Sequence, residues 1–480
     1  MWAFINDCIS QNEASILFDK DNKISYSELL KIVEKIGDIM KKLLPSKSKC
    51  AILCDKGLNT AIAILSCWYA DLVPIPMSKN YGENHCKNII ELTNPDIIIY
   101  DKNIPISFSG TRFNIITNEI INNQIVTKVE DILHDIAVIM CTSGTTGIPK
   151  GAMITKQGLI KNVENIAAYF DIKKDDTIMI ARPLYHCAVL TGEFLVSLYK
   201  GLNIGFFDES YNPVSLINFI NENNITVLCG TPTLFNHISM CLKRTDYKNN
   251  IKTIAVSGEC LSKKIAENIR SAFPNVYIYN IYGLTEAAPR VSYLSPEYFD
   301  EYPESVGIPL NDTFIKIVDM ENREKELQNN MHGKIMIKSP SIMKGYYNDE
   351  VLTKSVLIDG WLYTGDIGYK NANGFLYIVS RADDMIIKAG MNISPKEIED
   401  IINEIDIIDG SIVYGIFDEN GQNIAIDLVL NNKSDNISIK ELMKLFADVL
   451  PSYQIPTSIN IVDKIERNAS GKIIRRRASK

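Results

Sequence analysis

The sequence predicts an α/β protein: a large N-terminal domain of helix-covered, mainly parallel sheets, a β-rich subdomain, and a small α+β domain at the C-terminus. Three observations support this prediction. Short β-branched segments alternate with amphipathic helical patterns up to about residue 300. From about Tyr302, short strand-like segments alternate with turns, and after Arg381 the chain carries two further helical patterns and a basic end. Strands that alternate with helices form mostly parallel sheet covered on both faces.

The N-terminal part of the chain shows the alternation clearly. Ser27 is a candidate cap for a helix whose apolar positions recur near 3.6 residues, and Pro45 ends that helix. A strand is expected at 51–54, a helix at 58–70 and another strand at 97–100. The pattern therefore indicates a first set of parallel strands with covering helices.

The alternation returns in the middle of the chain and changes near its end. We expect strands, with helices between them, at 178–180, 227–229, 254–256 and 276–279. In the later β-rich part, strands are expected at 333–337 and 374–379. The two helical patterns of the C-terminal part lie at 395–405 and 439–450.

Composition and charge are those of a soluble globular protein. Of the 480 residues, 46% are hydrophobic and 22% are charged, and the length suggests about two to four domains or subdomains. The net charge of −8 opposes nucleic-acid binding. The N-terminus lacks signal-peptide features, and the longest apolar run, 61–70, is too short to span a bilayer. The ten cysteines contain no C-x-x-C pair, which favours reduced thiols in the cytoplasm over structural zinc.

A segment rich in glycine and hydroxyl groups, CTSGTTGIPKG at 141–151, lies between two expected strands, 136–140 and 152–155. Glycine lets backbone N–H groups approach a ligand, hydroxyls add donors, and Lys150 adds a positive charge, so the segment suits phosphate. It is not the common phosphate loop, because a proline precedes the lysine and a strand, not a helix, follows. A mobile surface hairpin is the alternative for this composition.

Four later segments also combine glycine with polar side chains. In the first, an apolar strand runs into Tyr282-Gly283-Leu284-Thr285-Glu286. The carboxyl end of a parallel strand is where α/β proteins hold ligands. Thr285 can donate to a phosphate, and Glu286 can help to hold a Mg²⁺ ion that bridges phosphates. A turn with a helix-capping threonine is the alternative.

The other three segments carry little information when each is taken alone. In GWLYTGDIG at 360–368, Asp366 can accept both hydroxyls of a ribose or form only an Asx turn. Segment 380–395 gathers charges and glycine as at a hinge, or as in a solvated linker. Segment 468–477 places Lys472 after a flexible Ser-Gly and before a basic run, which alone is typical of a solvated tail.

Taken together and in this order, these segments resemble the adenylate-forming superfamily. That group includes acyl-CoA synthetases, aryl-acid ligases, adenylation domains of non-ribosomal peptide synthetases, and beetle luciferases. The resemblance runs from about residue 10 to the end and rests on the motifs TSGTTGIPKG, YGLTE, YTGDIG, SRADDMIIKAGMNISPKEIE and ASGK. It implies a large domain of stacked sheets at 1–381, which binds the acid and ATP, and a small mobile domain at 383–480.

The resemblance also implies roles for the residues that match the family motifs. The loop that handles the ATP phosphates would contain Thr142, Ser143, Gly144, Thr145, Thr146 and Lys150. The end of the later strand would bind adenine through Tyr282 and Gly283, the α-phosphate through Thr285 and Mg²⁺ through Glu286. The ribose hydroxyls would be bound by Asp366 with help from Arg381.

Three further matches concern the C-terminal part of the chain. Asp383 matches the hinge between the large and small domains. Gly390 lies on the loop that borders the pantetheine tunnel in the family's second conformation. Lys472 matches the lysine that reaches both the substrate carboxylate and the α-phosphate during adenylation.

The resemblance places the acid pocket near 182–190, 257–259 and the Tyr282 segment. Candidate lining residues are His186, Cys187, Leu190, Gly258, Glu259, Gly283 and Leu284. His186 falls where acyl- and aryl-acid ligases often carry a catalytic histidine, although a core histidine is the alternative. Amino-acid-activating members carry an aspartate after an aromatic residue here, and this chain has only Glu193. Because an unpaired buried ammonium costs several kcal/mol, an aryl or short-to-medium aliphatic acid is expected.

The implied reaction is ATP- and Mg²⁺-dependent activation of a carboxylic acid as an acyl adenylate, with release of pyrophosphate. The acyl group then passes to a phosphopantetheine thiol of coenzyme A or of an acyl carrier protein, and the short chain slightly favours a carrier protein. Neither a membrane nor a nucleic acid is an expected partner. The alternatives are an amino-acid-adenylating enzyme, a non-catalytic nucleotide-binding protein, an oxidative luciferase, and a nucleic-acid-binding protein suggested only by the basic run at 475–477.

Overall fold

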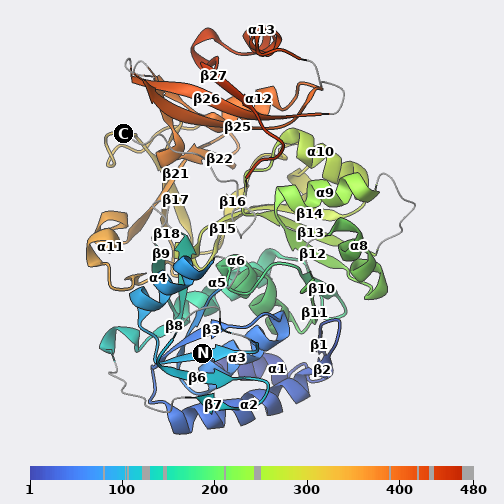
Figure 1. Ribbon diagram of the computed structural model, residues 1–480, viewed down its shortest axis with the longest axis vertical. Coiled ribbons are helices and arrows are strands. Elements are labelled where there is room, and N and C mark those ends of the chain that lie inside the picture. The colour runs from blue at the N-terminus through green and yellow to red at the C-terminus, as the bar shows by residue number, and fades with distance from the viewer. Residues whose placement is uncertain are drawn as a thin grey trace. The chain divides into compact units, whose positions relative to one another are not determined.

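The structure is a computed structural model that describes residues 1–78, 82–102, 104, 108–121, 130–143, 149–209, 212–242, 250–388, 391–418, 421–431 and 437–466. The chain divides into two compact units (Figure 1). The first comprises Met1–Leu261, Ile265–Phe314 and Ile337–Leu362, and the second comprises Ser262–Lys264, Ile315–Met336 and Tyr363–Lys480. Asp383 therefore lies within the second unit, and its role as a hinge stays a prediction.

A nine-stranded sheet forms one part of the first unit, in the order β16-β15-β14-β13-β12-β10-β11-β1-β2. Its strands are β1 (Ile16–Phe18), β2 (Lys23–Ser25), β10 (Thr177–Ile180), β11 (Asn203–Phe206), β12 (Val227–Gly230), β13 (Thr253–Ser257), β14 (Tyr277–Gly283), β15 (Arg290–Leu294) and β16 (Ile308–Pro309). The pairings from β1 through β14 are parallel, whereas β2, β15 and β16 are antiparallel to their neighbours.

Helices connect the parallel strands of this sheet and lie along it (Figure 1). They include α8 (Pro213–Glu222), α9 (Pro232–Leu242) and α10 (Lys263–Ala272). Residues 156–200 form α5 (Lys156–Tyr169), α6 (Cys187–Val189), the π-helix η3 (Leu190–Leu195) and α7 (Val196–Lys200), with β10 between α5 and α6. The strands and helices expected in this region are confirmed, with small shifts at their ends.

Two further sheets belong to the first unit. A five-stranded sheet has the order β4-β3-β5-β6-β7, and a three-stranded sheet has the order β19-β9-β8. Their strands are β3 (Lys49–Leu53), β4 (Val73–Pro76), β5 (Ile97–Tyr100), β6 (Thr111–Asn114), β7 (Ile120–Ile121), β8 (Ile136–Ser143), β9 (Pro149–Thr155) and β19 (Gly345–Tyr346). The two sheets share a buried core that includes Ala51, Ile98, Ile139 and Met153.

The helices near the N-terminus are α1 (Trp2–Ser10), α2 (Tyr26–Leu43), α3 (Gly57–Tyr69) and α4 (Glu83–Thr93). The expectation that Ser27 caps α2 is wrong. The cap is Ser25, whose hydroxyl accepts from Glu28 N at 3.1 Å while Glu28 Oε2 accepts from Ser25 N at 2.7 Å. This reciprocal pair satisfies two backbone donors at once, which fixes the start of the helix at the earlier serine.

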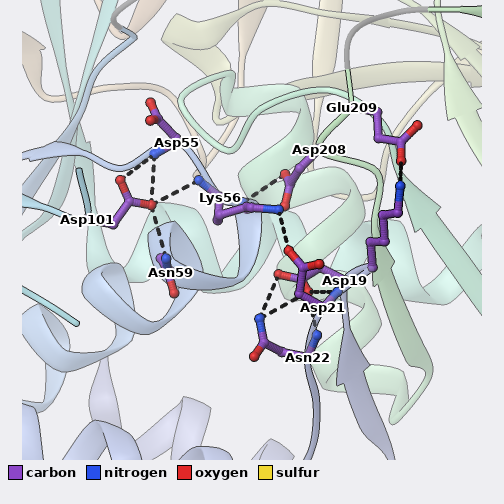
Figure 2. A network of polar contacts seen from close by, with 11 residues as sticks. Asp19, Asp21, Asn22, Asp55, Lys56, Asn59, Asp101, Asp208 and Glu209 are labelled. Atoms are coloured by element: carbon purple, nitrogen blue, oxygen red, sulfur yellow. Dashed lines mark hydrogen bonds and ion pairs between the residues drawn. The ribbon is translucent and has the colours of Figure 1, made fainter. Parts of the chain in front are cut away.

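The first turn of α3 is stabilised by aspartates from elsewhere in the sequence (Figure 2). Lys56 occupies the N-cap position and its side chain makes no capping hydrogen bond. Instead, Asp101 accepts from the backbone N–H groups of Asp55 and Lys56 at 2.9 and 3.1 Å, and Asp208 accepts from Gly57 N at 2.9 Å. Because helix N-termini attract negative charge, this network joins the five-stranded sheet to the end of β11.

A β-rich part follows in the chain, as the change in sequence pattern predicts, and most of its residues belong to the second unit. A five-stranded sheet runs β17-β18-β21-β20, with β22 paired to β21. Its strands are β17 (Phe314–Val318), β18 (Gly333–Lys338), β20 (Leu357–Ile358), β21 (Trp361–Lys370) and β22 (Leu376–Arg381). The short helix α11 (Glu350–Val356) precedes β20, and both belong to the first unit.

The C-terminal part of the second unit is a small α+β structure (Figure 1). It contains a hairpin of β23 (Ile386–Lys388) and β24 (Met391–Ile393), and a sheet of β25 (Ile408–Asp418), β26 (Gly421–Leu430) and β27 (Ser458–Ile461). The helices α12 (Pro395–Ile402) and α13 (Ile439–Val449) pack with this sheet in one core that includes Ile398, Ile426, Leu442 and Phe446. Both helices are those expected from the sequence, and the predicted fold class is confirmed.

None of the helices in the described part of the chain has the length and apolar character that crossing a bilayer requires.

Candidate functional site

The glycine-rich segment joins the two long strands of the three-stranded sheet, as predicted. β8 and β9 run antiparallel, and Thr142 lies opposite Lys150 in their register. The tip of the hairpin, with Gly144, Thr145 and Thr146, lies outside the described residues, as does the side chain of Ser143. The described arms thus place Thr142 and Lys150 side by side where the hairpin begins.

Lys150 faces an aromatic ring that the sequence does not single out. The Nζ atom of Lys150 lies 5.7 Å from the centre of the Tyr346 ring, within the range of a cation–π interaction. Strand β19 brings Tyr346 there by pairing with β9, with Tyr346 opposite Ala152. A cavity of about 170 Å³ adjoins these side chains and is lined by Leu92, Pro149, Lys150, Gly151, Tyr346, Tyr347, Asp349 and Leu352.

The YGLTE motif lies at the carboxyl end of β14, beside the end of the parallel strand β13. Tyr282 is buried, and the register between β14 and β15 shifts at Gly283. A Cβ atom at Gly283 would lie 2.3 Å from the carbonyl oxygen of Pro289, so only glycine fits this close approach. The chain then turns through η4 (Thr285–Ala287), which presents Thr285 and Glu286 at the edge of the sheet.

Glu286 suits a Mg²⁺ ion that also binds phosphates. Its Oε1 atom accepts a hydrogen bond from the hydroxyl of Tyr346 at 2.7 Å. Its Oε2 atom has no hydrogen-bond partner among the described residues. Those residues also include no cluster of three or more His, Cys, Asp or Glu side chains that could hold a metal. One carboxylate is what Mg²⁺ commonly takes from a protein when phosphates and water supply the remaining ligands.

The segment predicted to line the acid pocket contacts the YGLTE motif. His186 occupies the N-cap position of α6, and Cys187 and Leu190 are buried behind it. The Sγ atom of Cys187 lies 4.0 Å from the carbonyl oxygen of Thr285, so the two predicted pocket segments meet. Burial raises the pKa of the Cys187 thiol to about 12, so this cysteine acts as a small apolar wall and not as a nucleophile.

The short helix that follows is a π-helix, η3, a rare form that is frequent at functional sites. It carries Glu193, which is fully buried and accepts from Arg182 Nη2 at 2.6 Å. Burial raises the pKa of Glu193, while Arg182 and Arg290 oppose that shift. Glu193 therefore already has a cationic partner within the protein, which argues against its pairing with the ammonium of an α-amino acid.

The remaining pocket candidates lie at the end of β13. Gly258 has φ = +94° and would place a Cβ atom 3.7 Å from Arg182 Nη1, so Arg182 lies beside it. Glu259 accepts from the hydroxyl of Thr233 at 2.8 Å. Leu284, between the strand end and η4, is half-buried. These residues share the carboxyl edge of β13 and β14, where α/β sheets hold ligands.

The two residues predicted to bind the ribose form a pair in the second unit. Asp366 and Arg381 lie opposite each other in the register of β21 and β22. Asp366 Oδ1 lies 3.0 Å from Arg381 Nη1, and Asp366 is only 5% exposed. Gly365 has φ = +74°, and a Cβ atom there would lie 3.1 Å from Arg381 Nη2. The glycine therefore permits the arginine to pack against the turn that holds Asp366.

For three predicted site residues of the C-terminal part, the structure describes no side chain. Asp383 lies in the short helix η6 (Ala382–Asp384), and its side chain is outside the described residues. Gly390 and Lys472 also lie outside the described residues. Conversely, Tyr346 contacts the site but belongs to none of the predicted motifs, and its only signal in the sequence is the Gly-Tyr-Tyr that follows Lys344.

Comparison with known proteins finds relatives along the whole chain. The family model of the AMP-binding enzyme matches residues 7–347, and that of the AMP-binding enzyme C-terminal domain matches residues 397–472. A 2-succinylbenzoate–CoA ligase of Bacillus licheniformis is 28% identical over 95% of this chain and 94% of the relative. A long-chain-fatty-acid–CoA ligase of Bacillus subtilis is 32% identical over 72% of this chain and 61% of the relative.

The chain is also similar to solved structures of o-succinylbenzoate CoA synthetase from Bacillus subtilis. The complex with the acyl-adenylate intermediate has a TM-score of 0.85 at 25% identity, covering 98% of this chain and 96% of that chain. The complex with ATP and magnesium ion has a TM-score of 0.84 at 25% identity, covering 98% of each chain.

Proposed function

This chain belongs to the family of AMP-binding enzymes, and we propose that it joins a carboxylic acid to a thiol in two ATP-dependent steps. One observation carries the proposal. In the first unit, Lys150 of the glycine-rich hairpin lies over the ring of Tyr346, and the hydroxyl of the same tyrosine binds the carboxylate of Glu286. A cation and a metal-binding carboxylate held that near to each other suit a triphosphate with its Mg²⁺ ion.

The first step is adenylation of the acid. A carboxylate oxygen of the acid attacks the α-phosphorus of ATP, a new P–O bond forms, and the bond to pyrophosphate breaks. Both reactants are anions, so charge neutralisation dominates the barrier. We propose that Lys472 reaches both the carboxylate and the α-phosphate, and that Thr285 donates to that phosphate. Mg²⁺, held by Glu286, would neutralise the phosphates when bound.

The second step transfers the acyl group. The thiol sulfur attacks the carbonyl carbon of the adenylate, the thiol proton is lost, and AMP leaves with the bonding electrons. The relatives reported above are named as coenzyme A ligases or synthetases, which favours coenzyme A as the acceptor. A carrier-protein thiol is the second candidate, since both acceptors end in the same phosphopantetheine group.

The acid that we propose is an aryl or short-to-medium aliphatic carboxylic acid. Cys187 and Leu190 offer a small apolar wall, and Glu193 is engaged by Arg182. One relative acts on 2-succinylbenzoate, an aryl acid, and another on long-chain fatty acids. We also infer a reducing, cytoplasmic location, because none of the ten cysteines, all of them among the described residues, forms a disulfide.

The proposal is tested by acid-dependent ATP–pyrophosphate exchange with a panel of aryl acids, fatty acids of graded length and amino acids. We expect exchange with at least one aryl or aliphatic acid. Exchange with α-amino acids alone would refute the pocket assignment. ATP binding without exchange for any acid would favour the non-catalytic nucleotide-binding alternative.

The role of Lys472 is tested by Lys472→Ala in the same assay. Loss of one preorganised charge at a transition state lowers the rate by about 10²–10³-fold, and we expect a fall of this size in exchange. Lys464→Ala removes an exposed lysine eight positions earlier in the sequence and serves as the matched control. If Lys472→Ala exchanges at the wild-type rate, the mechanism proposed for the first step is wrong.

A further inference from the structure

Two consecutive tyrosines, Tyr346 and Tyr347, send their hydroxyl groups to different carboxylates. The hydroxyl of Tyr346 donates to Glu286 Oε1 at 2.7 Å. The hydroxyl of Tyr347 donates to Glu130 Oε1 at 2.8 Å and accepts from Lys49 Nζ at 2.7 Å. Both rings are largely buried, with 7% and 2% of the residue exposed. The sequence thus places two chemically identical side chains in different roles, one at the candidate metal carboxylate and one away from it.

The backbone around Tyr346 is fixed from several sides. Tyr346 lies opposite Ala152 in the pairing of β19 with β9. Its backbone N–H donates to Thr353 Oγ1 at 2.8 Å, and that hydroxyl in turn donates to Asp349 O at 2.7 Å. With its main chain anchored on both sides, the Tyr346 ring has little freedom to leave Glu286.

The same segment also holds the main chain of Glu286. Met343 N donates to Glu286 O at 2.8 Å, and Lys344 N donates to Met153 O at 2.9 Å. Residues 343–346 therefore contact Glu286 at its backbone carbonyl and at its carboxylate while they are paired to β9. Because β9 also carries Lys150, the segment connects the phosphate hairpin directly to the carboxylate at the end of β14.

We propose that Tyr346 is the positioning residue of the metal carboxylate. Its hydroxyl binds one oxygen of Glu286 and fixes the side chain so that the other oxygen is left for Mg²⁺. Its ring at the same time faces the ammonium of Lys150. Hydrogen-bond partners behind a metal ligand hold that ligand in its binding orientation, and their loss typically weakens metal affinity about 10–100-fold. This inference rests on the proposed function, because it assumes that Glu286 binds the metal of a metal–ATP complex.

Tyr346→Phe tests the proposal because it removes the hydroxyl and keeps the ring that faces Lys150. Binding of Mn²⁺ is measured by the electron paramagnetic resonance signal of the free ion, with a non-hydrolysable ATP analogue and without any acid. We expect at least a tenfold weaker Mn²⁺ affinity than in the wild type. In pyrophosphate exchange, the Mg²⁺ concentration for half-maximal rate should rise by a similar factor, while the rate at saturating Mg²⁺ changes less.

Tyr347→Phe is the matched control. It removes the adjacent hydroxyl, which contacts Lys49 and Glu130 and not Glu286. We expect a lower melting temperature, because Lys49 is buried and loses a partner, and an unchanged Mn²⁺ affinity. A purely structural role for Tyr346 would make the two variants alike, with lower stability and the same metal affinity.

A double variant shows whether Tyr346 acts through Glu286. We expect Glu286→Gln to weaken Mn²⁺ binding on its own. Adding Tyr346→Phe should then weaken it by no more than twofold, because the group to be positioned is already altered. The proposal is overturned if Tyr346→Phe binds Mn²⁺ within twofold of the wild type. It is also overturned if the full tenfold effect persists in the Glu286→Gln background.

Two results with the wild-type protein distinguish a failure of this inference from a failure of the proposed function. The proposed reaction would be refuted if the wild-type protein binds the Mn²⁺–analogue complex but none of the acids tested supports pyrophosphate exchange. The comparison of Tyr346→Phe with wild type would still be possible in that case. Wild-type protein that does not bind the complex would refute both the assignment of Glu286 and the role of Tyr346.

Discussion

Asp176 is a buried carboxylate that joins the beginnings of three neighbouring strands. Its Oδ1 atom accepts from Thr226 Oγ1 and from Lys252 Nζ, both at 2.9 Å, and its Oδ2 atom accepts from Lys173 N at 2.9 Å. Thr226 and Lys252 immediately precede β12 and β13, while Asp176 precedes β10. Burial alone would raise the pKa of Asp176, but the hydrogen bonds from Lys252, Lys173 and Thr226 together outweigh it and hold the pKa below its usual value.

This shift predicts a loss of stability in acid. A carboxyl whose pKa is lower in the folded than in the unfolded state contributes stability above the unfolded pKa, near 4, and that contribution disappears as the pH falls through the folded pKa. Asp176→Asn should lower the free energy of unfolding at pH 7 by about 1–3 kcal/mol. The difference from wild type should shrink between about pH 5 and pH 3.

Urea unfolding at a series of pH values measures this difference. Asp175→Asn changes the exposed neighbour and should leave both the stability and its pH dependence close to wild type. A difference between Asp176→Asn and wild type that stays constant down to pH 3 would contradict the proposed role of the ionised carboxylate.

At the level of single residues, the candidates that the sequence offers belong to contiguous motifs, and their roles stay predictions. Asp366 and Glu286 each stand within a short run of glycine, hydroxyl and aromatic residues whose chemistry can be recognised locally. Tyr346 could not be found in this way, because its proposed role comes from contact with a carboxylate sixty positions earlier in the chain. The sequence could not decide whether Glu193 pairs with a substrate ammonium, for a related reason. Its partner, Arg182, becomes evident only when η3 packs beside the end of β10.

Helix α3 shows how distant residues decide where an element begins. Local signals predict the helix at about Leu58, but no residue at its start supplies a side-chain cap. The donors of its first turn are satisfied by Asp101, which follows β5, and by Asp208, which follows β11 (Figure 2). Asp101 also accepts from Asn59 Nδ2 at 3.0 Å, so one carboxylate binds three donors of this turn.

Asp101→Ala tests the strength of this connection. Removing the carboxylate leaves the backbone N–H groups of Asp55 and Lys56 and the amide of Asn59 without this acceptor. We expect the free energy of unfolding to fall by about 2–3 kcal/mol, in the range measured for hydrogen bonds to a charged group. Equilibrium urea unfolding followed by circular dichroism gives this value.

Asp101→Asn provides a graded control for the same site. It keeps one carbonyl oxygen as an acceptor and loses the charge, so its cost should lie between wild type and Asp101→Ala. If Asp101→Ala is as stable as wild type, water replaces the carboxylate without cost and the network in Figure 2 does not stabilise the helix.

At the level of elements, periodicity predicted which segments are helices and strands better than where each one starts. The start of α2 was misassigned because two serines lie near it, and only the reciprocal contact with Glu28 distinguishes Ser25 from Ser27. The π-helix η3 was not predicted at all. All of its residues are buried, so the segment has no exposed polar face whose period could indicate a wider turn.

At the level of the whole molecule, alternating strands and helices predicted the α/β class but not the order of strands in each sheet. The nine-stranded sheet places β1, near the N-terminus, beside β11, almost two hundred residues later. The expected two-domain division also differs from the compact units, because residues 315–336 belong to the second unit with the C-terminal part. Such neighbours are set by long-range packing, which local periodicity does not report.

The two proposed half-reactions place conflicting demands on the C-terminal part of the chain. In the proposed mechanism, Lys472 lies beside the α-phosphate during adenylation, whereas the thiol must enter the same region during transfer. We propose that a rotation at Asp383 resolves the conflict, as hinge closure does in other two-domain enzymes. Asp383 lies in η6, directly after β22 in the sequence. A hinge residue must change its backbone angles, and proline prevents this by fixing φ near −65°.

Asp383→Pro should therefore separate the two steps. If proline holds the adenylation arrangement, pyrophosphate exchange should stay within about threefold of wild type. Thioester formation with coenzyme A should fall at least about tenfold, because binding and chemistry of the second step need the rotated state. Asp383→Ala removes the same carboxylate without restricting the backbone and should leave both rates near wild type. Equal losses of both activities in Asp383→Pro would show that the hinge lies elsewhere or that one arrangement serves both steps. Equal losses in Asp383→Ala would show instead that the carboxylate itself is required, since alanine leaves the backbone free to rotate.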